Sequence, residues 1–380
     1  MYRVRSVFSA KCSMGKVGVV SRTLILKKDH LLPLLRKLHK THGLVAPVCN
    51  EYGDTIFSEI HDLDATAIDM ENQPQASIKS FFFPQTETLC SYIVDMESGT
   101  GNMEYSFHPL LPENSPTVFF GVRSCDMFAV MYCDMVFLHE NPKDIYYEQH
   151  RDNSIFISIG CNKPFTNCFC NATRTGPFLD AGYDLQLTDL GDRWFVETGR
   201  PRGIKLTEDW ASFFTQATEA DKRAQFQAEL EARGLFNRLV HVDLAIKLLQ
   251  ESHVPDRIIE ELSERCQDCG GCAYICPTCT CFNIADLKLS PDSGERIRSW
   301  DACTFEGFTR MAGNHNPIHV EKQRIRKRFL HKLQHDVEKH GRTSCVGCGR
   351  CVGMCFGGVD IIRFVDMLTA AGENGPGGQQ

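Results

Sequence analysis

The segment CQDCGGCAYICP (residues 266–277) holds four cysteines within eleven positions and closes on Pro277. The same C-x2-C-x2-C-x3-C spacing recurs at residues 345–355, although Phe356 follows there in place of the proline. Structural zinc usually takes pairs of ligands that are separated by a dozen or more residues. Four cysteines at the observed spacing are typical of iron–sulfur cluster ligands. The two runs therefore predict two [4Fe–4S] clusters rather than zinc.

The spacing also predicts which cysteines share a cluster. In two-cluster ferredoxins with this run, the fourth cysteine of each run binds the cluster of the other run. Carried onto this chain, the rule gives one cluster to Cys266, Cys269, Cys272 and Cys355, and the second to Cys345, Cys348, Cys351 and Cys276. We therefore expect the two runs to meet in space despite the 68 residues between them.

Composition narrows the class of protein. The chain has 19 cysteines in 380 residues, and they are bunched rather than scattered. Disulfide-dense proteins are typically short and secreted, and no secretory signal is apparent here, so disulfides are disfavoured. A formal net charge of −7 gives no reason to expect nucleic acid as a partner. No apolar run reaches the roughly 18 to 20 residues that a membrane span needs.

Patterning along the chain predicts the domain organisation. Leucines at helical spacing predict a helix within residues 30–43, and the apolar runs 117–122 and 154–160 read as buried strands. We expect an α/β domain over residues 24–205, a helical connector over 206–255, and a mostly helical domain over 256–368 that carries a split two-cluster ferredoxin-like module. The fold class is thus α/β or α+β.

The two ends of the chain have unusual compositions. Residues 1–28 carry seven Lys or Arg and no acidic residue. An organelle transit peptide has such a composition, but we prefer a disordered basic leader over residues 1–23 and a reducing cytoplasmic location. The end of the chain, residues 369–380, is rich in glycine and polar residues and is expected to be disordered.

A further set of cysteines follows the two predicted strands. Cys125 comes just after strand 117–122, and Cys161 comes just after strand 154–160, with Cys168 and Cys170 close behind. Loops beyond the carboxyl ends of strands are where α/β sheets bind their ligands. The four thiols are consistent with a third cluster, with zinc, or with buried unliganded cysteines.

Three spare cysteines, Cys279, Cys281 and Cys303, lie between the two ferredoxin-type runs. They are candidates for an additional metal site or for small buried side chains near the clusters. Residues 322–342 then carry eight Lys or Arg and two acidic residues on an expected helix, which suggests a solvated face or a docking surface. Neither a G-x-G-x-x-G nor a P-loop motif is present, so we expect no nucleotide or flavin site in this chain and no catalytic residues.

Several short motifs resemble one known family. They are FFFPQTETL (81–89), CFCN (168–171), CPTCTCF (276–282), SWDACTF (299–305), MAGNHN (311–316) and SCVGCGRC (344–351). Together they resemble the family of ferredoxin-type iron–sulfur subunits of anaerobic sulfite reductase, to which the sulfhydrogenase beta subunits are related, in the same order from about residue 24 to 368. The resemblance implies a third cluster on the residues that match Cys125, Cys161, Cys168 and Cys170.

The resemblance also implies a function and partners. It predicts an iron–sulfur electron-transfer subunit that works between a catalytic subunit and a flavin-containing, NAD(P)H-oxidising subunit. The catalytic subunit would be a siroheme sulfite reductase or a nickel–iron hydrogenase in an anaerobic complex. The alternative is a self-sufficient iron–sulfur reductase with an open metal site at Cys279, Cys281 and Cys303.

Overall fold

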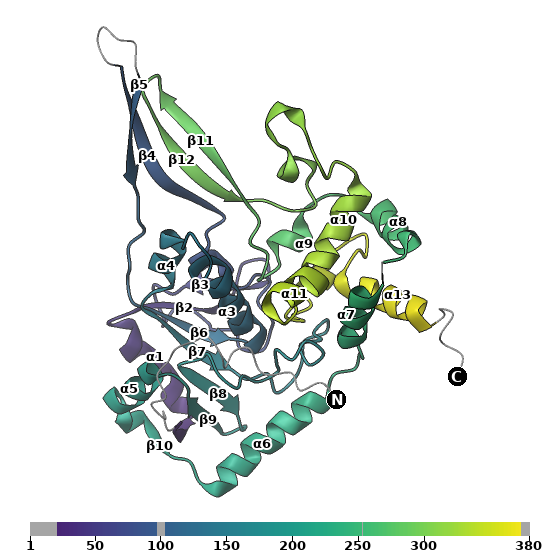
Figure 1. The fold of residues 1–380 in the computed structure, drawn as a ribbon. Coiled ribbons are helices and arrows are strands. Elements are labelled where there is room, and N and C mark those ends of the chain that lie inside the picture. The colour runs from purple at the N-terminus through teal and green to yellow at the C-terminus, as the bar shows by residue number, and fades with distance from the viewer. Residues whose placement is uncertain (1–20, 97–102, 253, 374–380) are drawn as a thin grey trace.

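The computed structural model describes residues 21–96, 103–252 and 254–373 (Figure 1). The strands are β1 (Thr23–Lys27), β2 (Gly43–Cys49), β3 (Thr55–Glu59), β4 (Thr86–Met96), β5 (Met103–Pro109), β6 (Thr117–Val122), β7 (Ser154–Ile159), β8 (Leu185–Asp189), β9 (Arg193–Thr198), β10 (Phe214–Gln216), β11 (Phe282–Ser290) and β12 (Ser293–Trp300). The α-helices are α1 (Lys28–His39), α2 (Lys79–Phe82), α3 (Ser124–Leu138), α4 (Ile145–Arg151), α5 (Pro201–Asp209), α6 (Glu219–Gly234), α7 (Val242–Glu251), α8 (Asp256–Arg265), α9 (Gly271–Tyr274), α10 (Glu321–Leu330), α11 (Asp336–His340), α12 (Arg350–Met354) and α13 (Ile361–Glu373). No helix among these residues is long and apolar enough to cross a membrane.

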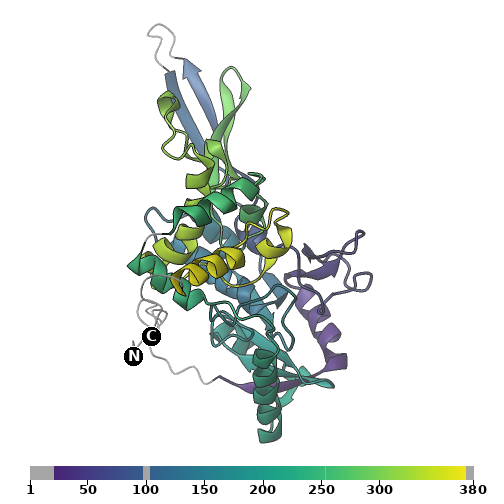
Figure 2. The same ribbon diagram turned by 90° about the vertical axis from the view of Figure 1, so that its right-hand side faces the viewer.

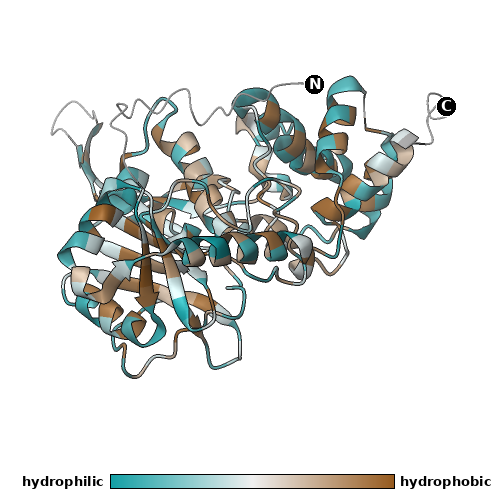
Figure 3. Cartoon of the chain, turned by 90° about the horizontal axis from the view of Figure 1, so that it is seen from below, coloured by the Kyte–Doolittle hydropathy of each residue, from teal (hydrophilic) through white to brown (hydrophobic). Residues whose placement is uncertain are grey.

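An eight-stranded mixed sheet organises the first half of the chain. Its strand order is β10-β1-β9-β8-β7-β6-β2-β3, and the central strands β2, β6, β7 and β8 run parallel. Both faces of strand β6 are buried, since Val118 and Phe120 pack beneath α1 while Phe119 packs beneath α3 and α4 on the opposite face. Viewed from below, hydrophobic strands lie between the covering helices (Figure 3).

The first predicted helix and both predicted strands are present. Helix α1 spans Lys28–His39 and buries Leu31, Leu34, Leu35 and Leu38, the residues whose spacing predicted it. Strands β6 and β7 run parallel in register, with Phe119 opposite Phe156. Parallel strands place their carboxyl ends at the same edge, so the loops that carry Cys125 and Cys161 are neighbours.

A second sheet of four antiparallel strands, β11-β12-β4-β5, forms an arm that extends away from the body of the molecule (Figures 1 and 2). Strand β12 pairs with β4 through Ser299 and Thr86, so the arm joins segments from both halves of the chain. The prediction of a mostly helical second domain is not confirmed, because the chain between the two cysteine runs also forms strands β11 and β12.

Four helices of the second half of the chain pack into a separate core beside the cysteine runs. Residues of α7, α8, α10 and α13 form it, and Phe329 and Phe364 stack in its centre with ring centroids 4.4 Å apart. Helix α10 continues through a π-helical turn, η5 (His331–His335), into α11. Phe169, from the loop between Cys168 and Cys170, also belongs to this core.

Two expected boundaries differ from the structure. The expected helical connector contains strand β10, which pairs with β1 and so belongs to the large sheet. Helix α13 extends to Glu373, so the expectation of disorder is wrong for residues 369–373. Near the other end, the backbone N–H of Arg22 donates to Thr198 Oγ1 at 2.8 Å. The expected leader up to residue 20 and the tail from residue 374 lie outside the described residues.

Candidate iron–sulfur sites

The structure gathers Cys266, Cys269, Cys272 and Cys355 at one place, which we call the first cradle. Helix α8 ends at Arg265 with Cys266 as its C-cap, and a left-handed turn through Gly270, with φ of 70°, leads into the short helix α9. Helix α12 packs against α9 and brings Cys355 to the other run. The backbone N–H of Val359 donates to Cys355 Sγ at 3.1 Å. Cys269 is exposed, so the first cradle reaches the protein surface.

The second cradle consists of Cys276, Cys345, Cys348 and Cys351. These four residues line a small cavity between α10, η5 and the loop before α12. Cys276, Cys345 and Cys348 are buried. Cys272 of the first cradle lines the same cavity, so the two cradles are adjacent. The fourth cysteine of each run therefore lies with the first three cysteines of the other run.

The third cradle consists of Cys125, Cys161, Cys168 and Cys170, whose thiols interact electrostatically with one another. Cys125 lies at the start of α3, and Cys161 follows β7 after Gly160. Burial raises the pKa of all four thiols, that of Cys168 to about 12. Thiols in such a site are costly to ionise unless a positively charged group compensates them.

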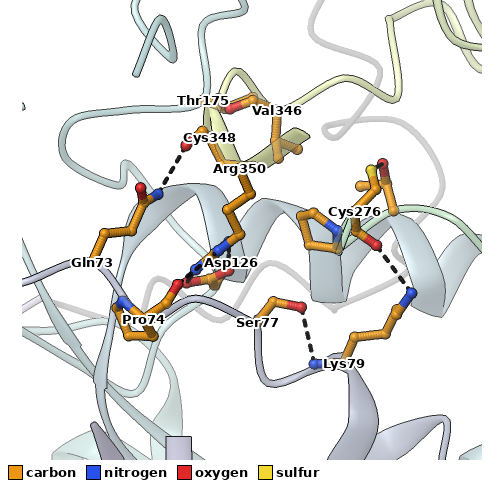
Figure 4. A network of polar contacts seen from close by, with 12 residues as sticks. Gln73, Pro74, Ser77, Lys79, Asp126, Thr175, Cys276, Val346, Cys348 and Arg350 are labelled. Carbon is orange, nitrogen blue, oxygen red and sulfur yellow. Dashed lines mark hydrogen bonds and ion pairs between the residues drawn. The ribbon is translucent and has the colours of Figure 1, made fainter. Parts of the chain in front are cut away.

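The second and third cradles share a wall. The carbonyl of Cys348 accepts a hydrogen bond from Gln73 Nε2 at 2.8 Å (Figure 4) and lies 3.6 Å from Cys168 Sγ. The backbone N–H of Phe169 donates to the carbonyl of Gly347 at 2.8 Å. Gly347 has φ of +60°, and a Cβ there would lie 2.7 Å from backbone atoms of Cys170. The close approach therefore requires glycine.

Each of the three spare cysteines has a thiol partner: Cys279 pairs with Cys276 of the second cradle, and Cys281 pairs with Cys303. The thiol of Cys279 hydrogen-bonds with that of Cys276, and this bond lowers the pKa of Cys276 despite its burial. The thiol of Cys303 hydrogen-bonds with that of Cys281 and lowers the pKa of Cys281 to about 7. Cys281 and Cys303 lie at the base of the β11–β12 hairpin, where the N–H of Asp301 also donates to the carbonyl of Cys281.

Two buried cations face the second cradle. Arg328 and Lys332 line its cavity, and their exposed fractions are only 6% and 8%. Burial lowers the pKa of Lys332, but the nearby sulfurs of Cys276 and Cys279 outweigh this effect, so the pKa lies well above its usual value. A buried cation needs a compensating negative charge. A cluster with four thiolate ligands carries net negative charge, so the cradle suits such a group.

The spacing of the thiols argues for clusters over zinc. Tetrahedral zinc with Zn–S bonds of about 2.3 Å holds its sulfurs about 3.8 Å apart. Within the described ranges, only the Cys266, Asp268 and Glu321 group places three candidate ligand atoms within 4.8 Å of one another. Asp268 of that group is engaged by Arg324 at 2.5 Å. None of the three cradles, within the described ranges, already has three of its thiols gathered this closely around one point.

The cations around the cradles were not predicted from the sequence. Eight basic residues on 322–342 suggested a solvated or docking surface, but the structure buries Arg324, Arg328 and Lys332. Two others on the same helix form ion pairs within the chain, Lys322 with Glu260 and Arg326 with Asp256. The spacing of Arg324, Arg328 and Lys332 at intervals of four residues, which places them on one face of a helix, was the signal present in the sequence. Nothing local marked Lys79, which lies in a short apolar segment.

Comparisons with known proteins agree with this geometry. Residues 265–359 match the family model of a 4Fe-4S dicluster domain, and this range contains both ferredoxin-type runs. The chain is also similar to the sulfhydrogenase 2 subunit beta of Pyrococcus furiosus, with 31% identity over 249 residues, which covers 66% of this chain and 73% of that protein. The chain belongs to the sulfhydrogenase beta subunit family. This family membership confirms the resemblance that the short motifs indicated. The third cradle lies outside the matched dicluster domain.

Proposed function

We propose that this member of the family relays electrons between a catalytic subunit and a flavin-containing, NAD(P)H-oxidising subunit. The catalytic subunit would be a nickel–iron hydrogenase or a siroheme sulfite reductase in an anaerobic cytoplasmic complex. Clusters bound in the cradles would supply the one-electron redox centres. The chain's own residues hold these centres, exclude water and fix their order.

The observation that carries this proposal is the row of three cradles. Cys348 belongs to the second cradle and lies against Cys168 of the third, and Cys272 links the second cradle to the first. Three of the four cysteines of the middle cradle are buried, whereas Cys269 at one end is exposed and two cysteines at the other end, Cys161 and Cys168, are partly exposed. A largely buried centre between two more accessible centres suits a relay that connects two partners.

The proposal predicts a defined iron content. Protein purified without oxygen is expected to contain about eight iron atoms and matching sulfide if two clusters bind, and about twelve if the third cradle is also filled. A reductive titration monitored by electron paramagnetic resonance should then show two or three reducible centres. About four iron atoms, or zinc in place of iron, would overturn the relay.

A second measurement addresses the partners and the alternative. Subunits that co-purify under anaerobic conditions should include a flavoprotein together with a siroheme or nickel–iron protein. The self-sufficient alternative requires an open metal site at Cys279, Cys281 and Cys303, and their division between two thiol pairs gives it no support. Reduction of sulfite or evolution of hydrogen by the isolated chain with an artificial donor would support that alternative instead.

A further inference from the structure

Thr278 connects a buried lysine to a cysteine of the second cradle. Lys332 Nζ lies 3.0 Å from Thr278 Oγ1, and Thr278 Oγ1 lies 3.3 Å from Cys276 Sγ. An ammonium group has only donors, so the threonine oxygen must accept the hydrogen bond from Lys332. The hydroxyl hydrogen is then free to point at the sulfur. Lys332 thus orients and polarises the donor that faces Cys276.

The placement of Lys332 is not explained by an ion pair. In the ranges that the structure describes, its Nζ atom donates to Thr278 and pairs with no carboxylate, and the groups that act on its charge include the sulfurs of Cys276, Cys279 and Cys345. The residue lies in the π-helical turn η5. Such turns are rare and occur frequently at functional sites. The π-helical turn and the neighbouring sulfurs are therefore both consistent with a role of Lys332 at the second cradle.

A second buried cation holds the same loop from the opposite side. Lys79 Nζ, from helix α2, donates to the carbonyl of Cys276 at 3.0 Å (Figure 4). It also donates to the carbonyl of Cys279 at 3.1 Å. It also lies 3.8 Å from the ring centroid of Trp300. These contacts fix the loop from Cys276 to Cys279, so Thr278 is held in place between Lys332 and the sulfur. Thr278 itself is only 2% exposed.

We propose that Lys332, acting through Thr278, raises the reduction potential of the centre held by Cys276. Reduction adds negative charge to a cluster, and a hydrogen bond to its sulfur ligand or a nearby buried cation stabilises the reduced form. Lys332 is a positioning residue because it acts on the ligand through the hydroxyl. This inference rests on the proposed relay, in which the middle centre must accept electrons from one neighbour and pass them to the other.

The test uses the full chain purified without oxygen. The midpoint potential of each centre is measured by a titration monitored by electron paramagnetic resonance, and the relevant centre is the one that Cys345→Ala abolishes. Lys332→Met removes the charge and Thr278→Val removes the hydroxyl while keeping the shape. Lys339→Met, on the same helical segment but exposed and paired with Glu140, is the matched control.

We expect Lys332→Met to lower the reduced-to-oxidised ratio of that centre about tenfold at a fixed potential, which is about 59 mV for a one-electron couple. Thr278→Val should shift the same centre in the same direction. Lys332→Met should have a smaller effect in the Thr278→Val background, because part of its influence passes through the hydroxyl. Lys332→Arg should restore part of the potential, whereas Lys339→Met should leave it unchanged.

An unchanged midpoint potential of this centre in Thr278→Val, with wild-type iron content, overturns the inference even if Lys332→Met does not fold. A failure of the relay itself gives a different result, because the wild-type chain would then lack two reducible centres. An equal shift in the midpoint potential of every centre would also contradict the inference. Such a result would indicate a general change of structure and not a local effect on the second cradle.

Discussion

Arg350 and Asp126 form a buried ion pair in which Nη1 and Nη2 of the arginine lie 2.6 and 3.0 Å from the two carboxylate oxygens (Figure 4). Arg350 lies between two cysteines of the second cradle, and Asp126 directly follows Cys125 of the third. Arg350 Nε also donates to the carbonyl of Pro74 at 2.9 Å. The pair therefore joins the cluster-bearing part of the chain to the large α/β domain.

Asp126→Asn is expected to destabilise the protein by about 3–5 kcal/mol, because it leaves the charge of Arg350 buried without a partner. Anaerobic denaturant unfolding measures the change. The control is Asp243→Asn, which breaks the exposed pair with Arg174 and should cost less than about 1 kcal/mol. Equal effects of the two substitutions would show that the buried pair does not join the two parts.

The prediction that the fourth cysteine of each run binds the cluster of the other run can be tested directly. Cys276→Ala and Cys345→Ala should abolish the same paramagnetic centre, and Cys269→Ala should abolish a different one. Each variant should lose about four iron atoms. Cys49→Ala, an exposed thiol at the end of β2, should lose none. If Cys276→Ala abolished the centre that Cys269→Ala abolishes, each run would bind its own cluster.

The third cradle makes a separate prediction. Cys170→Ala should lower the iron content from about twelve to about eight atoms per chain and leave both ferredoxin-type centres reducible. Iron and sulfide analysis together with the reductive titration measure this. Cys133→Ala is the matched control, since Cys133 is buried near Pro277 but belongs to no cradle. The same iron content in Cys170→Ala and the wild type would show that the third cradle binds no cluster.

Gly347→Ala should damage the wall between the second and third cradles. Its Cβ would lie 2.7 Å from backbone atoms of Cys170, and φ of +60° adds strain of about 1–2 kcal/mol. Gly53→Ala has a similar φ of +83° but open space around it, so it reports the strain alone. We expect a lower thermal midpoint and loss of iron only in Gly347→Ala. Equal midpoints and full iron content in both variants would contradict a close contact.

The sequence predicted the features that depend on local spacing. Leucines at helical intervals predicted α1, and apolar runs predicted β6 and β7, because periodicity reports which face of a single segment is buried. The repeated C-x2-C-x2-C-x3-C spacing likewise predicted a dicluster module, which the family comparison supports. The three thiols in one run lie close together because a few residues of chain separate them.

Relationships between distant segments were decided by the tertiary structure. The basic residues of 322–342 suggested a solvated face or a docking surface, yet helix packing buries Arg328 and Lys332 against the second cradle. Nothing in the sequence indicated that β4 and β12 would pair into an arm, or that Arg350 would meet Asp126. The physical reason is that local spacing determines which residues of one segment share a face. The partner of that face depends on how segments hundreds of residues apart pack together, and this packing places the buried cations beside the cysteines.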